Sequence, residues 1–235
     1  MTGDEGNAAD GRFPTASTPD LNRLRNSCKL FFMTSNYGKI IKDNLTRIYA
    51  NLPEALDKAL PAERKGNVFL FRAFGQDCSL EPEKITLGGS LETGPRGLLI
   101  SLYATHVNHE PVRLEPFVAF KDLPGSMPYH GAFSAHSEKV LLPHVTQIKE
   151  GQDVILGLFS GEMGLEGVAG DFSFVLYPLP KIALCYIFYL PDEEFPASVT
   201  CLFSQNALAF MPLDGLADVA EYTSKAIIEL LKGAR

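Results

Sequence analysis

Residues 170–198 read Gly-Asp-Phe-Ser-Phe-Val-Leu-Tyr-Pro-Leu-Pro-Lys-Ile-Ala-Leu-Cys-Tyr-Ile-Phe-Tyr-Leu-Pro-Asp-Glu-Glu-Phe-Pro-Ala-Ser. Within this stretch, residues 182–190 have the length and the β-branched and aromatic content of a buried strand. A second apolar run, residues 172–177, comes before it, and a Pro-Leu-Pro turn separates the two. Pro191 and Pro196 then force the chain out of the strand. We therefore predict a β-hairpin that is followed by an acidic turn.

Carboxylates stand at both outer ends of this predicted hairpin. Asp171 opens the first strand, and Asp192, Glu193 and Glu194 follow the second. The two ends of a hairpin are neighbours, and alternate residues of an extended chain point the same way, so Asp171, Asp192 and Glu194 form the preferred acidic set. Such a set can perform acid–base chemistry or bind a cation. The competing interpretation is a solvated turn whose carboxylates bind backbone N–H groups.

A turn-rich loop, residues 123–131, contains Tyr129 and His130. Loops of this composition often line pockets, so we predict a pocket between this loop and the acidic set, with Tyr129 and His130 as further ligand-binding candidates. His130, His136 and His144 are separated by six and eight residues. Because a helical metal site needs an i, i+4 pair, we expect no metal site here.

The rest of the chain mixes helices and strands. Apolar residues at helical spacing predict helices over 39–51 and 95–107 and a long C-terminal helix over 214–233. Residues 67–74 are a strand candidate, and residues 78–87 are predicted to form a turn and another strand. No regular βαβ alternation connects these elements. The expected fold class is therefore α+β, with a mixed or mainly antiparallel sheet and packed helices.

Composition narrows the functional class. The chain has 235 residues, 46% hydrophobic content and a net charge of -7, and its 21 basic residues are scattered, which argues against nucleic-acid binding. The longest apolar stretch, residues 172–190, is broken by prolines, so we expect no membrane span. Four widely spaced cysteines favour free thiols in a reducing cytoplasm and no cofactor. Residues 1–20 are predicted to be a disordered tail and 21–235 a single globular domain.

Several motifs also carry a family resemblance. They are Asp192-Glu-Glu-Phe-Pro196, Cys201-Leu-Phe-Ser204, Phe210-Met-Pro-Leu-Asp214, Gly170-Asp171, Pro178-Leu-Pro180 and Phe120-Lys-Asp-Leu-Pro124 with Tyr129. Together they resemble a bacterial and archaeal family catalogued as domain of unknown function 3786, over roughly residues 38–232. The family often has Leu-Phe-Asp where this chain has Leu-Phe-Ser204, and it often has Arg-Glu where this chain has Lys121-Asp122. The resemblance implies an anaerobic source and, for some members, an added iron–sulfur domain of the kind seen in corrinoid proteins.

Three functional hypotheses follow. The first is a cytoplasmic, cofactor-free accessory domain that binds a small polar or cationic ligand. The second is a hydrolase or isomerase with Asp171 or Asp192 as general base and His130 as acid. The third is an interaction module for an iron–sulfur or corrinoid protein, docking through exposed aromatic residues such as Tyr186 or Tyr189 or through the closing helix.

Overall fold

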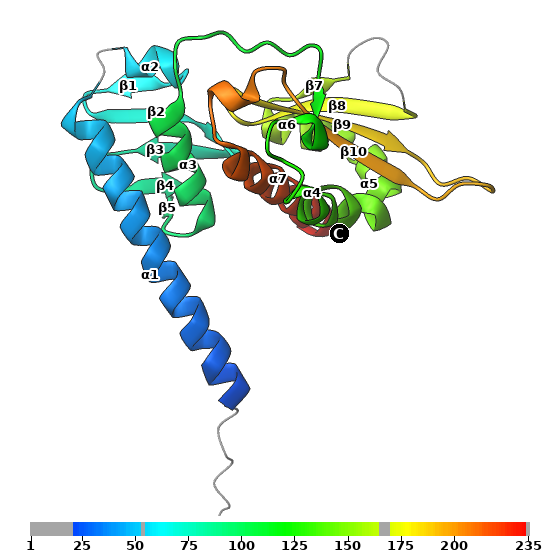
Figure 1. Cartoon of the computed structure of the whole chain (residues 1–235), viewed down its shortest axis with the longest axis horizontal. Helices are drawn as coiled ribbons and strands as arrows, with labels where there is room; N and C mark the ends of the chain where they lie inside the picture. Colours follow the sequence, from blue (N-terminus) through cyan, green and yellow to red (C-terminus); the bar gives the residue numbers. More distant parts are fainter. Residues whose placement is uncertain (1–20, 53–54, 165–169, 234–235) are drawn as a thin grey trace, which may run out of the picture.

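The computed structural model describes residues 21–52, 55–164 and 170–233, with side chains from residue 36 onward. Within these residues the chain forms two antiparallel five-stranded sheets with helices packed on them (Figure 1). The predicted α+β class and the long C-terminal helix are confirmed, although the strands divide between two sheets. The predicted tail, residues 1–20, and residues 165–169 lie outside the described residues.

The first sheet is a simple meander in which each strand pairs with the next along the chain. Its strands are β1 (Glu63–Lys65), β2 (Val68–Ala73), β3 (Gln76–Leu80), β4 (Ile85–Leu87) and β5 (Ser90–Leu91). The helices of this half are α1 (Leu21–Ala50), α2 (Leu56–Ala59) and α3 (Pro95–His106), and α1 packs along α3. The predicted helix over 95–107 corresponds closely to α3, which begins at Pro95 as expected for a proline in the first turn.

The second sheet has the order β6-β10-β9-β8-β7 and contains the hairpin predicted from the sequence. Its strands are β6 (Val118–Ala119), β7 (Glu162–Met163), β8 (Phe172–Leu179), β9 (Ile182–Tyr189) and β10 (Ser198–Phe203). The α-helices of this half are α4 (His130–Phe133), α5 (Val145–Glu150), α6 (Gln152–Phe159) and α7 (Leu213–Gly233). The shorter turns are η1 (Phe120–Asp122), the π-helical η2 (Ser134–Glu138), η3 (Lys139–His144) and η4 (Ala207–Ala209).

Both faces of the β8–β9 hairpin are buried, which explains its continuous apolar sequence. On one face Tyr186 reaches α7, where its hydroxyl lies 3.2 Å from Ser224 Oγ. On the other face Cys185 packs with Leu114 and Phe117, which belong to the long connection between α3 and β6. This connection crosses the sheet before the chain reaches α4, so it places residues 123–131 beside α7 rather than at the hairpin ends.

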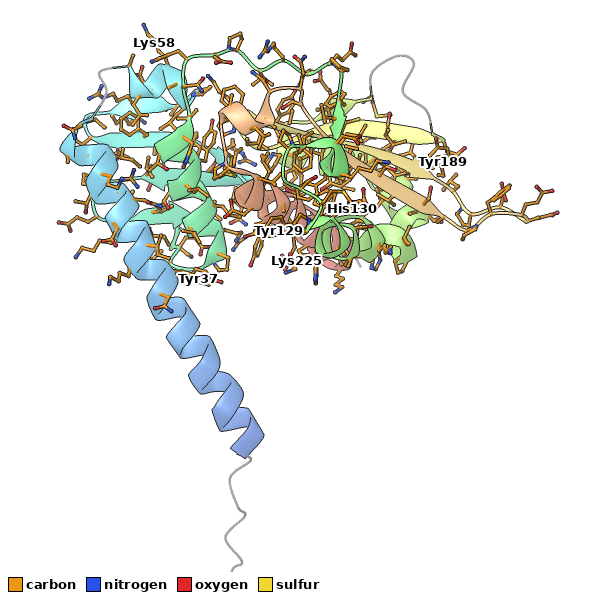
Figure 2. All side chains as sticks on the ribbon, in the orientation of Figure 1. Tyr37, Lys58, Tyr129, His130, Tyr189 and Lys225 are labelled. Carbon is orange, nitrogen blue, oxygen red and sulfur yellow. The ribbon has the colours of Figure 1, made fainter. Side chains whose placement is uncertain are left out.

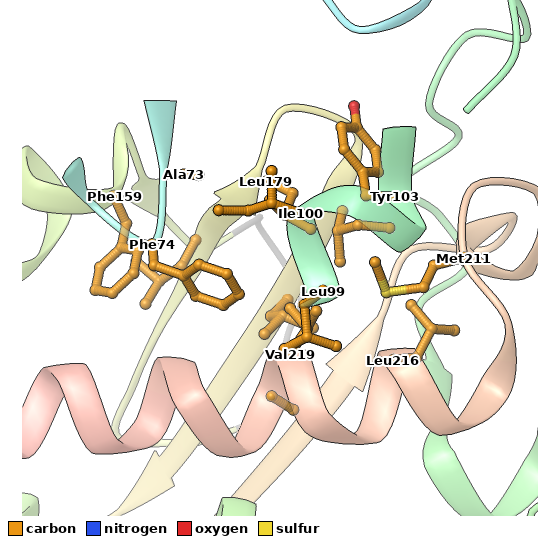
Figure 3. Close-up of a cluster of buried hydrophobic side chains, with 14 of the residues drawn as sticks. Ala73, Phe74, Leu99, Ile100, Tyr103, Phe159, Leu179, Met211, Leu216 and Val219 are labelled. Carbon is orange, nitrogen blue, oxygen red and sulfur yellow. The ribbon is translucent and has the colours of Figure 1, made fainter. Parts of the chain in front are cut away.

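The two sheets share one hydrophobic core. The backbone N–H of Phe74, just after β2, donates to the carbonyl of Pro178 in β8 over 2.7 Å. Around this bond, side chains of α3, β8 and α7 meet, among them Leu99, Leu179 and Val219 (Figure 3). The connection to β6 is fixed by Lys181, whose ammonium donates to the carbonyls of Asn108 and Glu110.

Candidate functional site

The connection between β9 and β10, residues 190–197, projects beyond the rest of the second sheet and is called the finger here (Figure 1). Two large apolar side chains are exposed on it or at its root: Phe195 keeps 66% of its surface exposed and Tyr189 keeps 41%. Asp192, Glu193 and Glu194 are exposed between them in the sequence. The finger therefore presents aromatic and acidic groups together.

Asp171 and Asp192 hold the local backbone at the root and the turn of the finger. Asp171 Oδ2 accepts the backbone N–H of Leu190 over 2.6 Å, which ties the first residue before β8 to the end of β9. Asp192 Oδ1 accepts the N–H groups of Glu194 and Phe195 over 2.8 and 2.7 Å. This arrangement is an Asx turn. Each aspartate therefore binds backbone N–H groups, as the competing interpretation predicts, but it uses only one of its two carboxylate oxygens to do so.

The same two aspartates line one hollow of about 420 Å³, together with Tyr189, Leu190, Phe195, Pro196 and Ser198. We call this the finger hollow. Within the described part of the chain, Asp171 Oδ1 and Asp192 Oδ2 accept no hydrogen bond, and neither carboxylate has an ion-pair partner. Residues 182–224 contain no lysine, arginine or histidine. The hollow thus combines two negative charges with two exposed aromatic rings.

The turn that contains Asp192 stabilises the negative charge of its carboxylate. Hydrogen bonds from the backbone N–H groups of Phe195 and then Glu194 lower the pKa of the Asp192 carboxyl group below its usual range. A general acid or base that works near neutral pH needs a pKa shifted towards neutrality. The shift at Asp192 runs the other way, which favours a fixed negative charge over proton transfer.

Gly170 explains why a glycine precedes Asp171. Its φ is +123°, and a Cβ built there would lie 2.7 Å from Ile187 Cγ2 and 3.0 Å from the Phe188 carbonyl oxygen. We expect Gly170→Ala to lower the free energy of unfolding by more than about 1 kcal/mol. Urea denaturation measures this, with Gly157→Ala as control, because the helical Gly157 has open space at its Cβ position. Equal losses in the two variants would contradict the steric argument.

The remaining candidates do not join the finger hollow. Tyr129 lines a different pocket, between α4 and α7, and Figure 2 shows Tyr129 and His130 beside α4, apart from Tyr189. Nδ1 of His130 is buried and has no hydrogen-bond partner among the described residues. Glu194 is exposed on the finger, but its side chain is not part of the hollow's lining. The loop and the acidic residues that were predicted to form one pocket are thus separated. His130 lines neither the pocket that contains Tyr129 nor the finger hollow.

The prediction that Tyr186 is an exposed docking residue is wrong. Tyr186 is fully buried and hydrogen-bonded to α7, so it cannot form an exposed contact surface. The reason is strand alternation: Tyr186 and Phe188 share the face that α7 covers, whereas Tyr189 lies beyond the covered region at the strand end.

Two features were missed in the sequence. The first is Phe195, which lies between carboxylates and prolines in a turn. A large aromatic ring has few packing partners in such a turn, so its position in the sequence indicates an exposed ring. The second is the row Asp214, Asp218 and Glu221, whose i, i+4, i+7 spacing places three acids on one face of α7. The apolar stripe and the end signals Asp214 and Gly233 predict this helix, but they do not reveal the acidic row.

Among the described residues, no group of three or more His, Cys, Asp or Glu side chains is arranged to hold a metal ion. Nor does any helix within the described ranges have the length and apolar character needed to cross a membrane.

Comparison with known proteins places the chain in one family. Searches of curated proteins and of solved structures each gave no match. A family model described as Domain of unknown function (DUF3786) matches residues 35–226, which is most of the chain and includes both sheets, the finger and α7 as far as residue 226. The chain therefore belongs to the DUF3786 family.

Proposed function

We propose that this protein is an accessory binding domain that docks onto a partner protein through the finger, with the finger hollow receiving an arginine side chain of the partner. The observation that carries this proposal is the pairing of two backbone-anchored aspartates with two exposed aromatic side chains around one hollow. A guanidinium group matches these features because it is planar, stacks on aromatic rings and donates hydrogen bonds in a fork to carboxylate oxygens.

The exposure of the finger favours a protein partner over a free small ligand. Sites for small molecules usually enclose most of the ligand surface. Phe195 and Tyr189 are too exposed for the hollow to do so alone, and a partner surface would supply the missing wall. Asp192, Glu193 and Glu194 would attract a basic surface over a longer distance and speed its association.

The setting that we propose for this docking is the cytoplasm. The thiols of Cys78, Cys185 and Cys201 are free and buried. Such thiols are typical of proteins that work in a reducing compartment.

A blocked glycine-rich peptide with one central arginine tests the proposal. Calorimetric titration should give saturable binding to the full chain, and the affinity should fall as salt is added. The same peptide with citrulline, a neutral isostere of arginine, should bind at least about fivefold more weakly. Equal affinities for the two peptides, or no binding of the arginine peptide, would overturn the proposed docking mode.

A further inference from the structure

A second pocket lies on another part of the molecule, between α4–η2 and α7. Its volume is about 230 Å³, and we call it the α7 pocket. One wall consists of Tyr129, Ala132, Phe133, His136 and Ser137, and the other of Asp214, Ala217, Asp218 and Glu221. No residue lines both this pocket and the finger hollow, so the two sites can be tested independently.

The α7 wall carries a negative charge that the described residues compensate only in part. Glu221 pairs with Lys225 over 2.5 Å, and Asp214 Oδ1 accepts the neighbouring N–H of Gly215. Asp218, between them, has no hydrogen-bond or ion-pair partner among the described residues. Desolvation by the packed side of the helix, with the charges of Glu221 and Asp214, raises the pKa of the Asp218 carboxyl group, while Lys225 opposes the shift. A cation in the pocket would relieve this repulsion.

Ser137 provides an independent sign of a ligand. Its side chain is fully buried, it lines the pocket, and its Oγ has no hydrogen-bond partner among the described residues. Buried hydroxyl groups in native proteins are normally satisfied, so a free one at a pocket wall marks a place for a polar ligand atom.

Ser137 is held in position relative to the acids. It lies in the π-helical turn η2, and such turns occur frequently at functional sites. Its carbonyl accepts the hydroxyl of Ser224 from α7 over 2.6 Å. This bond connects η2 to α7, the helix that carries Asp218.

We propose that the α7 pocket binds a small organic ammonium ion, with its charge at Asp218, one N–H donated to Ser137 Oγ, and its apolar body between Phe133 and Ala217. The apolar side chains of the walls favour an organic cation over a metal ion. A cavity of 150 Å³ holds a benzene molecule, so 230 Å³ holds a ligand of about ten non-hydrogen atoms.

Phenethylammonium is a suitable probe, and 2-phenylethanol, which has the same size and no charge, is its matched control. Calorimetric titration of the full chain should show one site for phenethylammonium and at least about fivefold weaker binding of the alcohol. Asp218→Asn and Ser137→Ala should each weaken phenethylammonium binding, by about fivefold for the charge change. Glu229→Gln, which removes an exposed acid of α7 outside the pocket, should leave the affinity unchanged.

Three results would overturn the proposal: no binding of phenethylammonium to the folded wild-type protein, equal binding of the alcohol, or unchanged affinity in Asp218→Asn. Thermal melting shows whether Ser137→Ala still folds, and Asp218→Asn tests the site without altering a buried residue. Because Asp171 and Asp192 are intact in all three variants, failure here leaves the arginine docking test unaffected.

Discussion

Replacement of Phe188 by alanine is expected to lower the free energy of unfolding by about 3–5 kcal/mol. Phe188 is fully buried, stacks on Phe172 with ring centroids 4.6 Å apart, and contacts the rings of Phe174 and Tyr186. Its removal opens a cavity beneath the root of the finger, where few side chains can move in to fill it. Urea denaturation followed by circular dichroism measures the loss.

The adjacent Tyr189 is the matched control for Phe188. It is partly exposed at the end of the same strand, so Tyr189→Ala should cost much less than Phe188→Ala. Similar losses in the two variants would contradict the assignment of the α7-covered face of the hairpin as the core.

Simultaneous replacement of Asp171 and Asp192 by asparagine is expected to weaken binding of the arginine peptide about tenfold and to lower the melting temperature only slightly. Asparagine keeps an oxygen that can accept the N–H groups of Leu190, Glu194 and Phe195, so the finger retains its shape. The two negative charges are lost, and the second oxygen of each side chain becomes an NH2 group, which cannot accept a hydrogen bond from a guanidinium group. Calorimetric titration and thermal melting measure the two quantities.

The double variant Glu83→Gln/Glu229→Gln is its control, because it makes the same change in net charge at exposed positions outside the finger hollow. An equal loss of affinity in this control would mean that overall charge attracts the peptide. In that case the finger hollow would have no special role.

The hairpin was predictable because its signal is local. Residues 182–190 form an unbroken apolar run, and the structure has β9 over Ile182–Tyr189, paired with β8. The pairing of hairpin ends also brought Asp171 and Asp192 to one hollow, as two-strand geometry implies.

The rest of the candidate site depends on the path of the chain between distant elements. Tyr129 and His130 lie beside α7 because the connection after α3 crosses the second sheet before it turns into α4. No local pattern in residues 107–131 specifies that route. The burial of Tyr186 likewise requires knowledge of which sheet face α7 covers, since β9 is apolar on both faces.

The most direct measurement of the proposed docking is a titration of isotope-labelled full-length protein with the arginine peptide, followed by amide NMR spectra. Docking of arginine in the finger hollow predicts saturable shifts centred on Asp171, Tyr189, Asp192 and Phe195, with much smaller shifts from the citrulline peptide. Shifts spread over all acidic surfaces, or shifts confined to residues outside the finger, would contradict it.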